Sequence, residues 1–152
     1  MYAEVLITRE NKKWSIKEHA LIGFSPEQME KHRIAQRMLE TVVNSWEFRQ
    51  ELLAASLTST KGMSNSEIYN LIINGKEVLS PVIDFQADIS VHAYLRKSGR
   101  VVGYTYPHTD KTWLNLKFFN KFNYAQVANN LFHEWLHKLG FDHRSASEKT
   151  SI

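Results

Sequence analysis

The stretch HEWLHKLGFDH, residues 133–143, constrains the fold of this chain more than any other segment. It overlaps the end of an apolar, amide-rich segment, 123–140, that predicts a helix. Asn123 and Gln126 stand at the spacing of a capping box, and Gly140 follows the last turn as a helix-ending glycine. We therefore expect the motif to lie on a helix that begins and ends at defined residues.

The two faces of this helix differ in character. At about 100° per residue, His133 and His137 fall on one side, about 40° apart. The opposite side carries the large apolar residues: Ala128, Leu131, Phe132, Trp135, Leu136 and Leu139. The pattern predicts one face in the core and two imidazoles together on the other, an arrangement for which core packing gives no reason.

Residues four apart on a helix are neighbours on one face, so His133 and His137 can bind one metal ion, each nitrogen at about 2.0–2.1 Å. Glu134 is offset by one residue, which favours contact with a water molecule on the ion over direct coordination. Gly140 can adopt a positive φ, so the chain can turn back and bring His143 to the same ion. Three nitrogens and a water are typical of catalytic zinc, and we expect Glu134 to be the general base.

Other segments predict a mixture of strands and helices. A turn at 97–100 is expected to return the following strand antiparallel to the one before it. The expected elements are a strand at 3–8, a long helix from 25 to about 57 with an apolar stripe (Met38, Val42, Trp46, Leu53, Leu57), a short helix at 65–75, and strands at 87–96, 101–107 and 112–118.

The motif His133, Glu134, His137, Gly140 and His143 resembles that of the metzincin clan of zinc peptidases, in which the histidines bind the zinc and the glutamate is the base. Residues 87–116 also look like the strand block of matrixins and astacins. The resemblance implies an α+β, zincin-like catalytic domain: a mixed, mostly parallel twisted sheet with an antiparallel edge strand, a long backing helix and an active-site helix.

The resemblance also assigns the strands. Ile89–Leu95 would be an inner parallel strand, Val101–Tyr106 the antiparallel edge strand over the cleft, and Trp113–Leu116 the strand before the active-site helix. In the clan the edge strand holds a peptide substrate through backbone hydrogen bonds. This implies a substrate-binding role for Gly103, Tyr104 and Thr105.

The chain departs from the clan pattern after His143. Metzincins place a methionine turn there, whereas Met1, Met29, Met38 and Met63 all lie upstream. Arg144 matches none of the residues that mark the subfamilies, and no tyrosine follows Tyr124. We therefore expect residues 1–152 to form a single catalytic domain whose C-terminal subdomain is minimal or truncated, with no assignable subfamily.

The amino-acid composition restricts the kinds of metal site, substrate and partner that we expect. The chain has no cysteine, which excludes a thiolate zinc site and a cysteine nucleophile. Its net charge of +3 is spread along the sequence, so we expect a peptide or protein substrate and no nucleic acid. No apolar run of membrane-spanning length and no secretory signal are visible, which predicts no membrane partner and a cytoplasmic location by default, with export by another route left open. A monomer is expected.

Three functions are consistent with these residues. The first is a zinc-dependent endopeptidase with one catalytic Zn²⁺. The second is a zinc-binding but proteolytically inactive module that captures peptides along the edge strand. The third is a basic helical interaction protein without a metal. The intact Glu134 favours the first, because a module that only binds does not need a base. The remaining histidines, His19, His32, His92 and His108, are expected to be structural or exposed.

Overall fold

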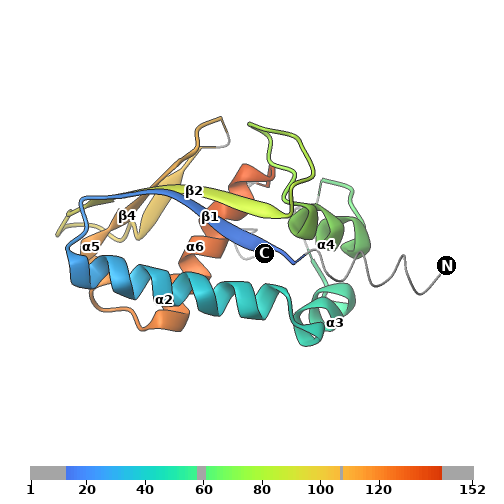
Figure 1. Ribbon diagram of the computed structural model, residues 1–152, viewed down its shortest axis with the longest axis horizontal. Coiled ribbons are helices and arrows are strands. Elements are labelled where there is room, and N and C mark those ends of the chain that lie inside the picture. The colour runs from blue at the N-terminus through green and yellow to red at the C-terminus, as the bar shows by residue number, and fades with distance from the viewer. Residues whose placement is uncertain (1–12, 58–60, 107, 142–152) are drawn as a thin grey trace.

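The computed structural model describes residues 13–57, 61–106 and 108–141. They form an α+β structure with a mixed four-stranded sheet and five helices (Figure 1). In chain order the elements are β1 Ser15–Ile22, α2 Pro26–Val43, α3 Trp46–Ala54, α4 Asn65–Asn74, β2 Gln86–Tyr94, β3 Gly103–Thr105, β4 Lys111–Asn115, α5 Leu116–Phe119 and α6 Tyr124–Lys138. Among the described helices, none is both long enough and apolar enough to span a bilayer.

The sheet is mostly parallel with one antiparallel pair, as expected. Its order is β1-β2-β4-β3, with β1 and β2 parallel, β2 and β4 parallel, and β3 antiparallel to β4. The strand after residues 97–100, β3, runs antiparallel to β2 as expected, since β2 is parallel and β3 antiparallel to β4, but it does not pair with β2. Because β4 takes the place beside β2, β3 pairs with β4 instead, through Tyr104 opposite Trp113, and forms the edge.

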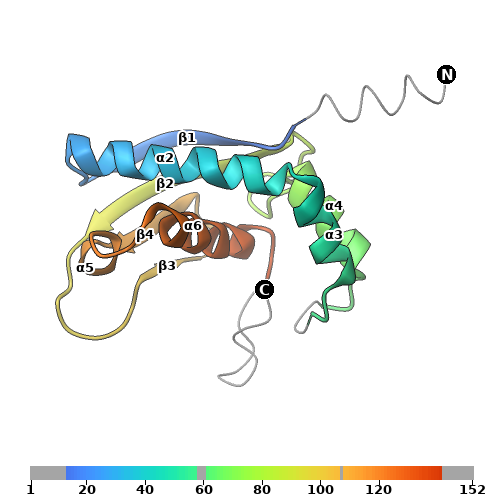
Figure 2. The same ribbon diagram turned by 90° about the horizontal axis from the view of Figure 1, so that it is seen from below.

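Helices α2 and α6 lie side by side against one face of the sheet (Figure 2). Alternate residues of β2 point toward them, so Ala87, Ile89 and Val91 are buried. Trp14, just before β1, is only 1% exposed, and its ring packs edge-on against Trp135 of α6 with centroids 5.3 Å apart. The apolar face predicted for the final helix is thus part of the core.

The expected long helix is two helices. It stops at Asn44, whose side-chain amide pairs with the backbone of Trp14: Trp14 N donates to Oδ1 at 2.9 Å, and Nδ2 donates to the Trp14 carbonyl at 2.8 Å. Ser45 then caps α3 by accepting from Phe48 N. These side-chain bonds compete with helix continuation, which a periodicity argument does not detect.

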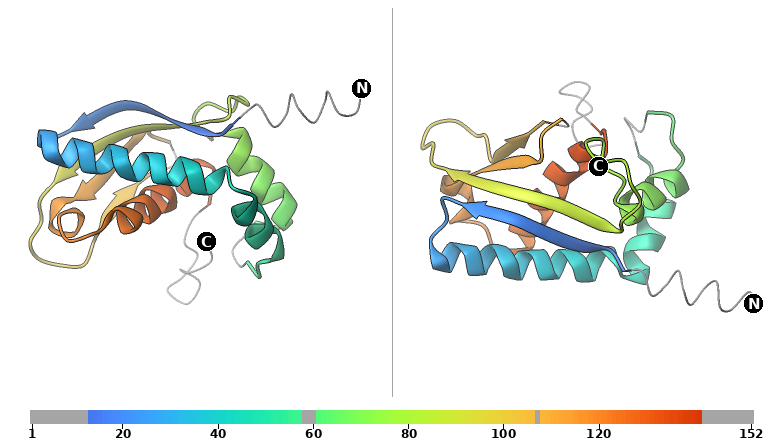
Figure 3. Two further views of the ribbon diagram at one scale, coloured as in Figure 1. Left: turned by 60° about the horizontal axis from the view of Figure 1, so that its bottom comes forward. Right: turned by 45° about the horizontal axis from the view of Figure 1, so that its top comes forward.

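The apolar stripe expected on that helix is also wrong in part. Met38, Val42 and Trp46 are 38%, 53% and 68% exposed. The buried face of α2 is instead the one carrying His32, Ala35, Gln36, Leu39 and Val43. The expected stripe assumes one continuous helix. In the structure α2 ends at Val43, and α3, capped by Ser45, runs in a different direction (Figure 3).

Strand β1 is an element that the sequence analysis missed. The strand expected at 3–8 lies outside the described residues. The SIKEHALI segment pairs in parallel with β2 from Ser15 opposite Gln86 to Ile22 opposite His92, with an irregularity at His19. The short helix α4 agrees with expectation: Ser64 and Glu67 form a capping box, and Gly75 ends the helix with φ of +64°.

Candidate metal centre

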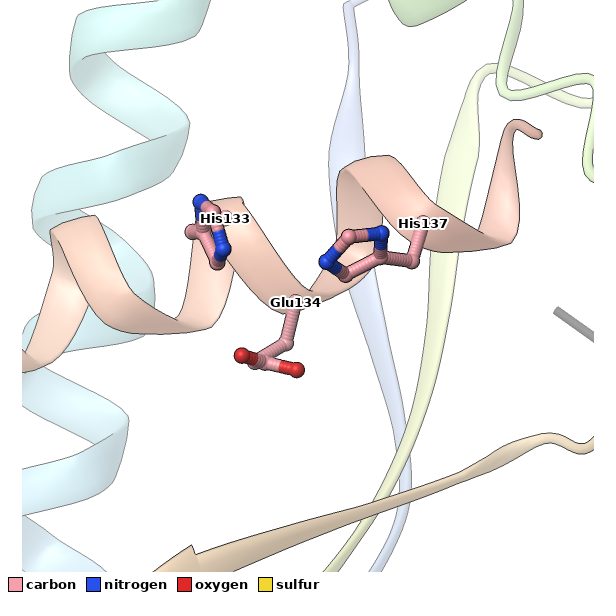
Figure 4. Close-up of side chains that lie close together, drawn as sticks. All are labelled: His133, Glu134 and His137. Carbon is pink, nitrogen blue, oxygen red and sulfur yellow. The ribbon is translucent and has the colours of Figure 1, made fainter. Parts of the chain in front are cut away.

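Helix α6 carries the first three residues of the motif, His133, Glu134 and His137, as expected. Asn123 caps it by accepting from Gln126 N at 2.8 Å, and the Gln126 side chain accepts from Asn123 N at 2.9 Å. Leu131 and Trp135 face the core at 1% and 2% exposure. The side chains of His133, Glu134 and His137 emerge together on another side of the same helix (Figure 4).

The two imidazoles face one another along the helix (Figure 4). Their ring centroids are 5.2 Å apart and the ring planes are nearly perpendicular, at 88°. One potential ligand atom from each of His133, Glu134 and His137 lies within 4.8 Å of the others. Donor atoms at about 2 Å from a single ion are at most about 4 Å apart, so these side chains lie close to the spacing that one ion requires.

A backbone contact sets the protonation of His137. Its Nδ1 lies 2.7 Å from the carbonyl oxygen of Phe141. A carbonyl only accepts hydrogen bonds, so Nδ1 carries the proton and Nε2 of the neutral ring keeps its lone pair. Histidines that bind metals commonly donate their other ring nitrogen in this way. The donor chemistry therefore fits zinc.

Gly140 makes that contact possible. Its φ is +104°, a conformation that residues with a side chain rarely adopt. The turn brings the chain back so that Phe141, 3% exposed, packs into the core while its carbonyl faces His137. The positive φ expected at Gly140 is confirmed. His143, the expected third ligand, and Asp142 lie outside the described residues.

Glu134 is more buried than a residue next to a metal ligand on a helix surface would be. It is 5% exposed, and burial raises the pKa of its carboxyl to about 7, against the opposing charge of Lys138. A carboxyl group whose pKa lies near neutral pH has the proton affinity that suits a general base.

The edge strand passes over α6. A Cβ built on Gly103 would lie 2.8 Å from the Trp113 carbonyl oxygen and 3.5 Å from Nδ2 of Asn130 on α6. Gly103 therefore permits the close approach of β3 to β4, whereas a Cβ there would make only an ordinary contact with α6. Within the described residues, β3 has a strand partner only on its β4 side, so its other edge carries backbone groups available to a peptide. Tyr104 points to the opposite face of the sheet and stacks on Trp113 at 5.0 Å.

An apolar groove of about 710 Å³ adjoins His133. The groove is bordered by α2, by α6, and by α3 together with the residues that follow α3. The lining includes Met38 and Val42, which explains why that stripe is apolar without being buried. Other lining residues are Phe48, Leu52, Leu57 and Phe132.

A second group of carboxylates, Glu77, Asp84 and Asp88, also has oxygens within 4.8 Å of one another. Glu77 is 5% exposed, and it accepts from Trp135 Nε1 at 2.7 Å and from Asp88 N at 3.1 Å. Burial raises the pKa of Glu77 to about 8, and its hydrogen bond to Asp88 adds to the rise. The raised pKa favours the protonated form of Glu77 beside the carboxylate of Asp88. Through its bond with Trp135, Glu77 also connects the segment before β2 to α6.

Lys138 is a residue whose environment the sequence analysis missed. It follows His137 directly, is 4% exposed, and donates from Nζ to three backbone carbonyls. Burial lowers its pKa to about 8, opposed by Asp110, Glu77 and Glu134. Lys138 lies four residues after Glu134 on α6, so both side chains are on one side of the helix. Because Glu134 was expected to face the site, this spacing could have indicated that Lys138 lies near it.

Comparison with protein-family models, with curated proteins and with solved structures found no match to this chain. The interpretation of the site therefore depends on the residues and geometry described above.

Proposed function

We propose that this chain is a zinc-dependent endopeptidase with a zincin-like catalytic domain. The observation that carries the proposal is the convergence of His133, Glu134 and His137 on one face of α6, with Nε2 of His137 left as a lone-pair donor. A helix presenting two imidazoles one turn apart, with a buried carboxylate beside them, has the donor set of a hydrolytic zinc site. The sheet order supports the proposal, since an antiparallel edge strand borders the same helix.

In this proposal His133, His137 and His143 hold the ion. When bound, zinc acts as a Lewis acid that polarises the scissile carbonyl and makes a water molecule a nucleophile at neutral pH. Glu134 accepts a proton from the attacking water and passes it to the leaving amine. Its buried position keeps bulk water away from the carboxylate, which strengthens its electrostatic interaction with the reacting groups.

The peptide is held by strand addition. The free edge of β3, Gly103 to Thr105, offers backbone donors and acceptors to an extended substrate. The apolar groove beside His133 then receives a large apolar side chain of that substrate. Backbone bonds to β3 do not depend on the substrate's side chains, and the groove receives only one of them. The proposal therefore predicts a preference at one substrate position rather than recognition of a long sequence motif.

Zinc content and cleavage test the proposal together. The purified chain is expected to bind one zinc per molecule and to cleave members of a peptide library in a chelator-sensitive reaction. Stoichiometric zinc without cleavage of any peptide would replace the proposal by a peptide-capture module. A purified chain that binds no zinc would exclude both the endopeptidase and the zinc-binding peptide-capture module.

A further inference from the structure

The edge strand β3 is only three residues long, so its own ladder cannot fix its position over α6. Hydrogen-bonded pairs alternate along an antiparallel ladder, so a strand of this length exchanges only about two to four backbone bonds with β4. Short edge strands are a common protection against unwanted pairing, but a strand that must align a peptide needs support from outside the ladder. Two buried polar side chains, one at each end of β3, supply that support.

The entry to β3 is held by Asn115, at the end of β4. Asn115 is 1% exposed, and its amide donates to the carbonyls of Arg96 and Val101 at 3.0 and 3.1 Å. Its Oδ1 accepts from Arg96 N at 3.1 Å and from Lys117 N at 3.1 Å. The loop that leads into β3 is thereby fixed to the strand beside it.

The exit from β3 is held by Lys138, at the end of α6. Its ammonium group donates to the carbonyls of Tyr106, Thr109 and Lys111, at 3.1 Å for Tyr106 and 2.8 Å for Lys111. These carbonyls belong to the turn that joins β3 to β4. An ammonium group has three donors, so the turn satisfies all of them. A buried lysine without such partners would be strongly unfavourable.

Asn115 ties strand to strand, whereas Lys138 ties the edge strand to the helix that carries the metal ligands. Lys138 follows His137 in the chain and lies one turn after Glu134. Its main-chain carbonyl also accepts from Val78 N at 2.8 Å, which fixes the last turn of α6 from the other side. Lys138 therefore links the turn that follows β3 directly to the end of the helix that carries His133 and His137.

We propose that Lys138 is a positioning residue that sets the height of the β3 edge above the metal-binding face of α6. It touches neither substrate nor ion; it places the strand that binds the peptide. This rests on the proposed function for its catalytic consequence, but the placement itself can be measured without turnover. Loss of the ammonium group removes one donor from each of the three carbonyls. The carbonyls of Tyr106 and Lys111 keep hydrogen bonds from Thr109 N and Thr105 Oγ1, so the Thr109 carbonyl is the one most affected, and the turn at Tyr106 to Lys111 loses its link to α6.

Lys138→Met tests this against Lys111→Met as the matched control. Lys111 is exposed, begins β4 at the end of the same turn and carries the same charge. Only its main-chain carbonyl accepts from Lys138, and its side chain makes none of the contacts above. In Lys138→Met, amide hydrogen exchange is expected to rise about tenfold or more in residues 103–106 and 111–113, with exchange in α2 and β2 unchanged. Zinc affinity, measured by calorimetry, is expected to stay within about twofold, because His133 and His137 keep their helix.

Kinetics with a cleaved library peptide separate the roles further. Lys138→Met is expected to raise KM about tenfold while kcat falls less, since peptide capture is weakened and the ligands and Glu134 remain. Lys138→Arg keeps donors for the carbonyls and is expected to fold and to shift exchange and KM in the same direction by less. It serves as the test variant if Lys138→Met does not fold.

Two results would overturn the proposal. One is an exchange increase spread over the whole domain with no excess in 103–113, which would make Lys138 a residue of general stability. The other is unchanged amide exchange in residues 103–106 of Lys138→Met together with loss of zinc binding. If the wild-type chain cleaves nothing, the proposed function fails, yet the exchange and zinc measurements still decide the role of Lys138.

Discussion

Nδ1 of His137 donates to the carbonyl oxygen of Phe141 at 2.7 Å, across a turn made by Gly140 with φ of +104°. One hydrogen bond thus fixes the tautomer and the ring orientation of His137. Because the bond depends on a backbone conformation that favours glycine, a substitution at Gly140 is expected to change the orientation of His137, the candidate metal ligand, without changing that residue itself.

Gly140→Ala is expected to weaken zinc binding about tenfold or more, because the strained turn displaces the Phe141 carbonyl from His137. Calorimetric titration with zinc measures the effect. Gly62→Ala is the control: Gly62 also has a positive φ, of +81°, but a Cβ there meets nothing within 4 Å, and Gly62 lies outside the metal-binding group. Both variants are expected to lose about 1–2 kcal/mol of stability. Equal zinc affinities in the two variants would contradict the role given to Gly140.

Glu134→Gln is expected to lower kcat at least about a hundredfold while zinc stays bound, because the amide cannot accept the proton from water. Metal analysis and cleavage of a library peptide are measured on the same preparation. Glu30→Gln, an exposed carboxylate 3.6 Å from Arg37 on α2, is the control and should cleave normally. Full activity in Glu134→Gln would exclude Glu134 as the base.

His143→Ala tests the third ligand. If His143 binds the ion with His133 and His137, its removal is expected to weaken zinc affinity on the order of a hundredfold. His108→Ala removes an exposed imidazole on the β3–β4 turn and provides the comparison. Unchanged affinity in His143→Ala would mean that another group completes the site.

His32 predicts a pH dependence of stability. It is fully buried against Phe24 and Phe119, accepts from Gln36 at Nδ1, and burial lowers its pKa from 6.5 to about 4, despite the opposing charge of Glu18. Between these two pKa values the unfolded chain binds the additional proton. The contribution of neutral His32 is therefore complete above about pH 6.5, and about 3 kcal/mol is lost as pH falls toward 4.

Urea unfolding of the wild type and of His32→Leu at pH 7 and pH 4.5 measures this dependence. Groups that do not interact electrostatically with His32 titrate equally in both proteins. The difference between the two proteins in stability change with pH therefore reports His32 together with its charge interaction with Glu18. The wild type is expected to lose more stability than the variant on acidification. Parallel losses would show that His32 is protonated inside the fold.

The groove beside His133 predicts substrate preference. Peptides with one large apolar residue are expected to be cleaved preferentially, and Val42→Asp is expected to reduce kcat/KM for them about tenfold. Val42 is 53% exposed, so the change places a charge in the groove without opening the core. Ile22→Asp, at a 51% exposed position at the end of β1, is the control. An equal effect in both variants would exclude the groove as a binding site.

The sequence by itself determined α6, the helix that carries the candidate metal ligands. The limits of α6, its core face, the shared side of His133 and His137, and the turn at Gly140 all follow from capping, the 3.6-residue period and the conformational freedom of glycine. These are properties of neighbouring residues, so no distant contact is needed to predict them. The short helix ending at Gly75 was predicted for the same reason.

Only the tertiary structure decided the rest, because distant residues compete with local preference. The pairing of Asn44 with Trp14, 30 residues away, ends a helix that periodicity would continue. The β3–β4 turn covers Lys138, a residue type that is rarely fully buried, and satisfies its ammonium group with three carbonyls. Whether a polar group is buried depends on partners that only the folded chain brings within hydrogen-bond distance.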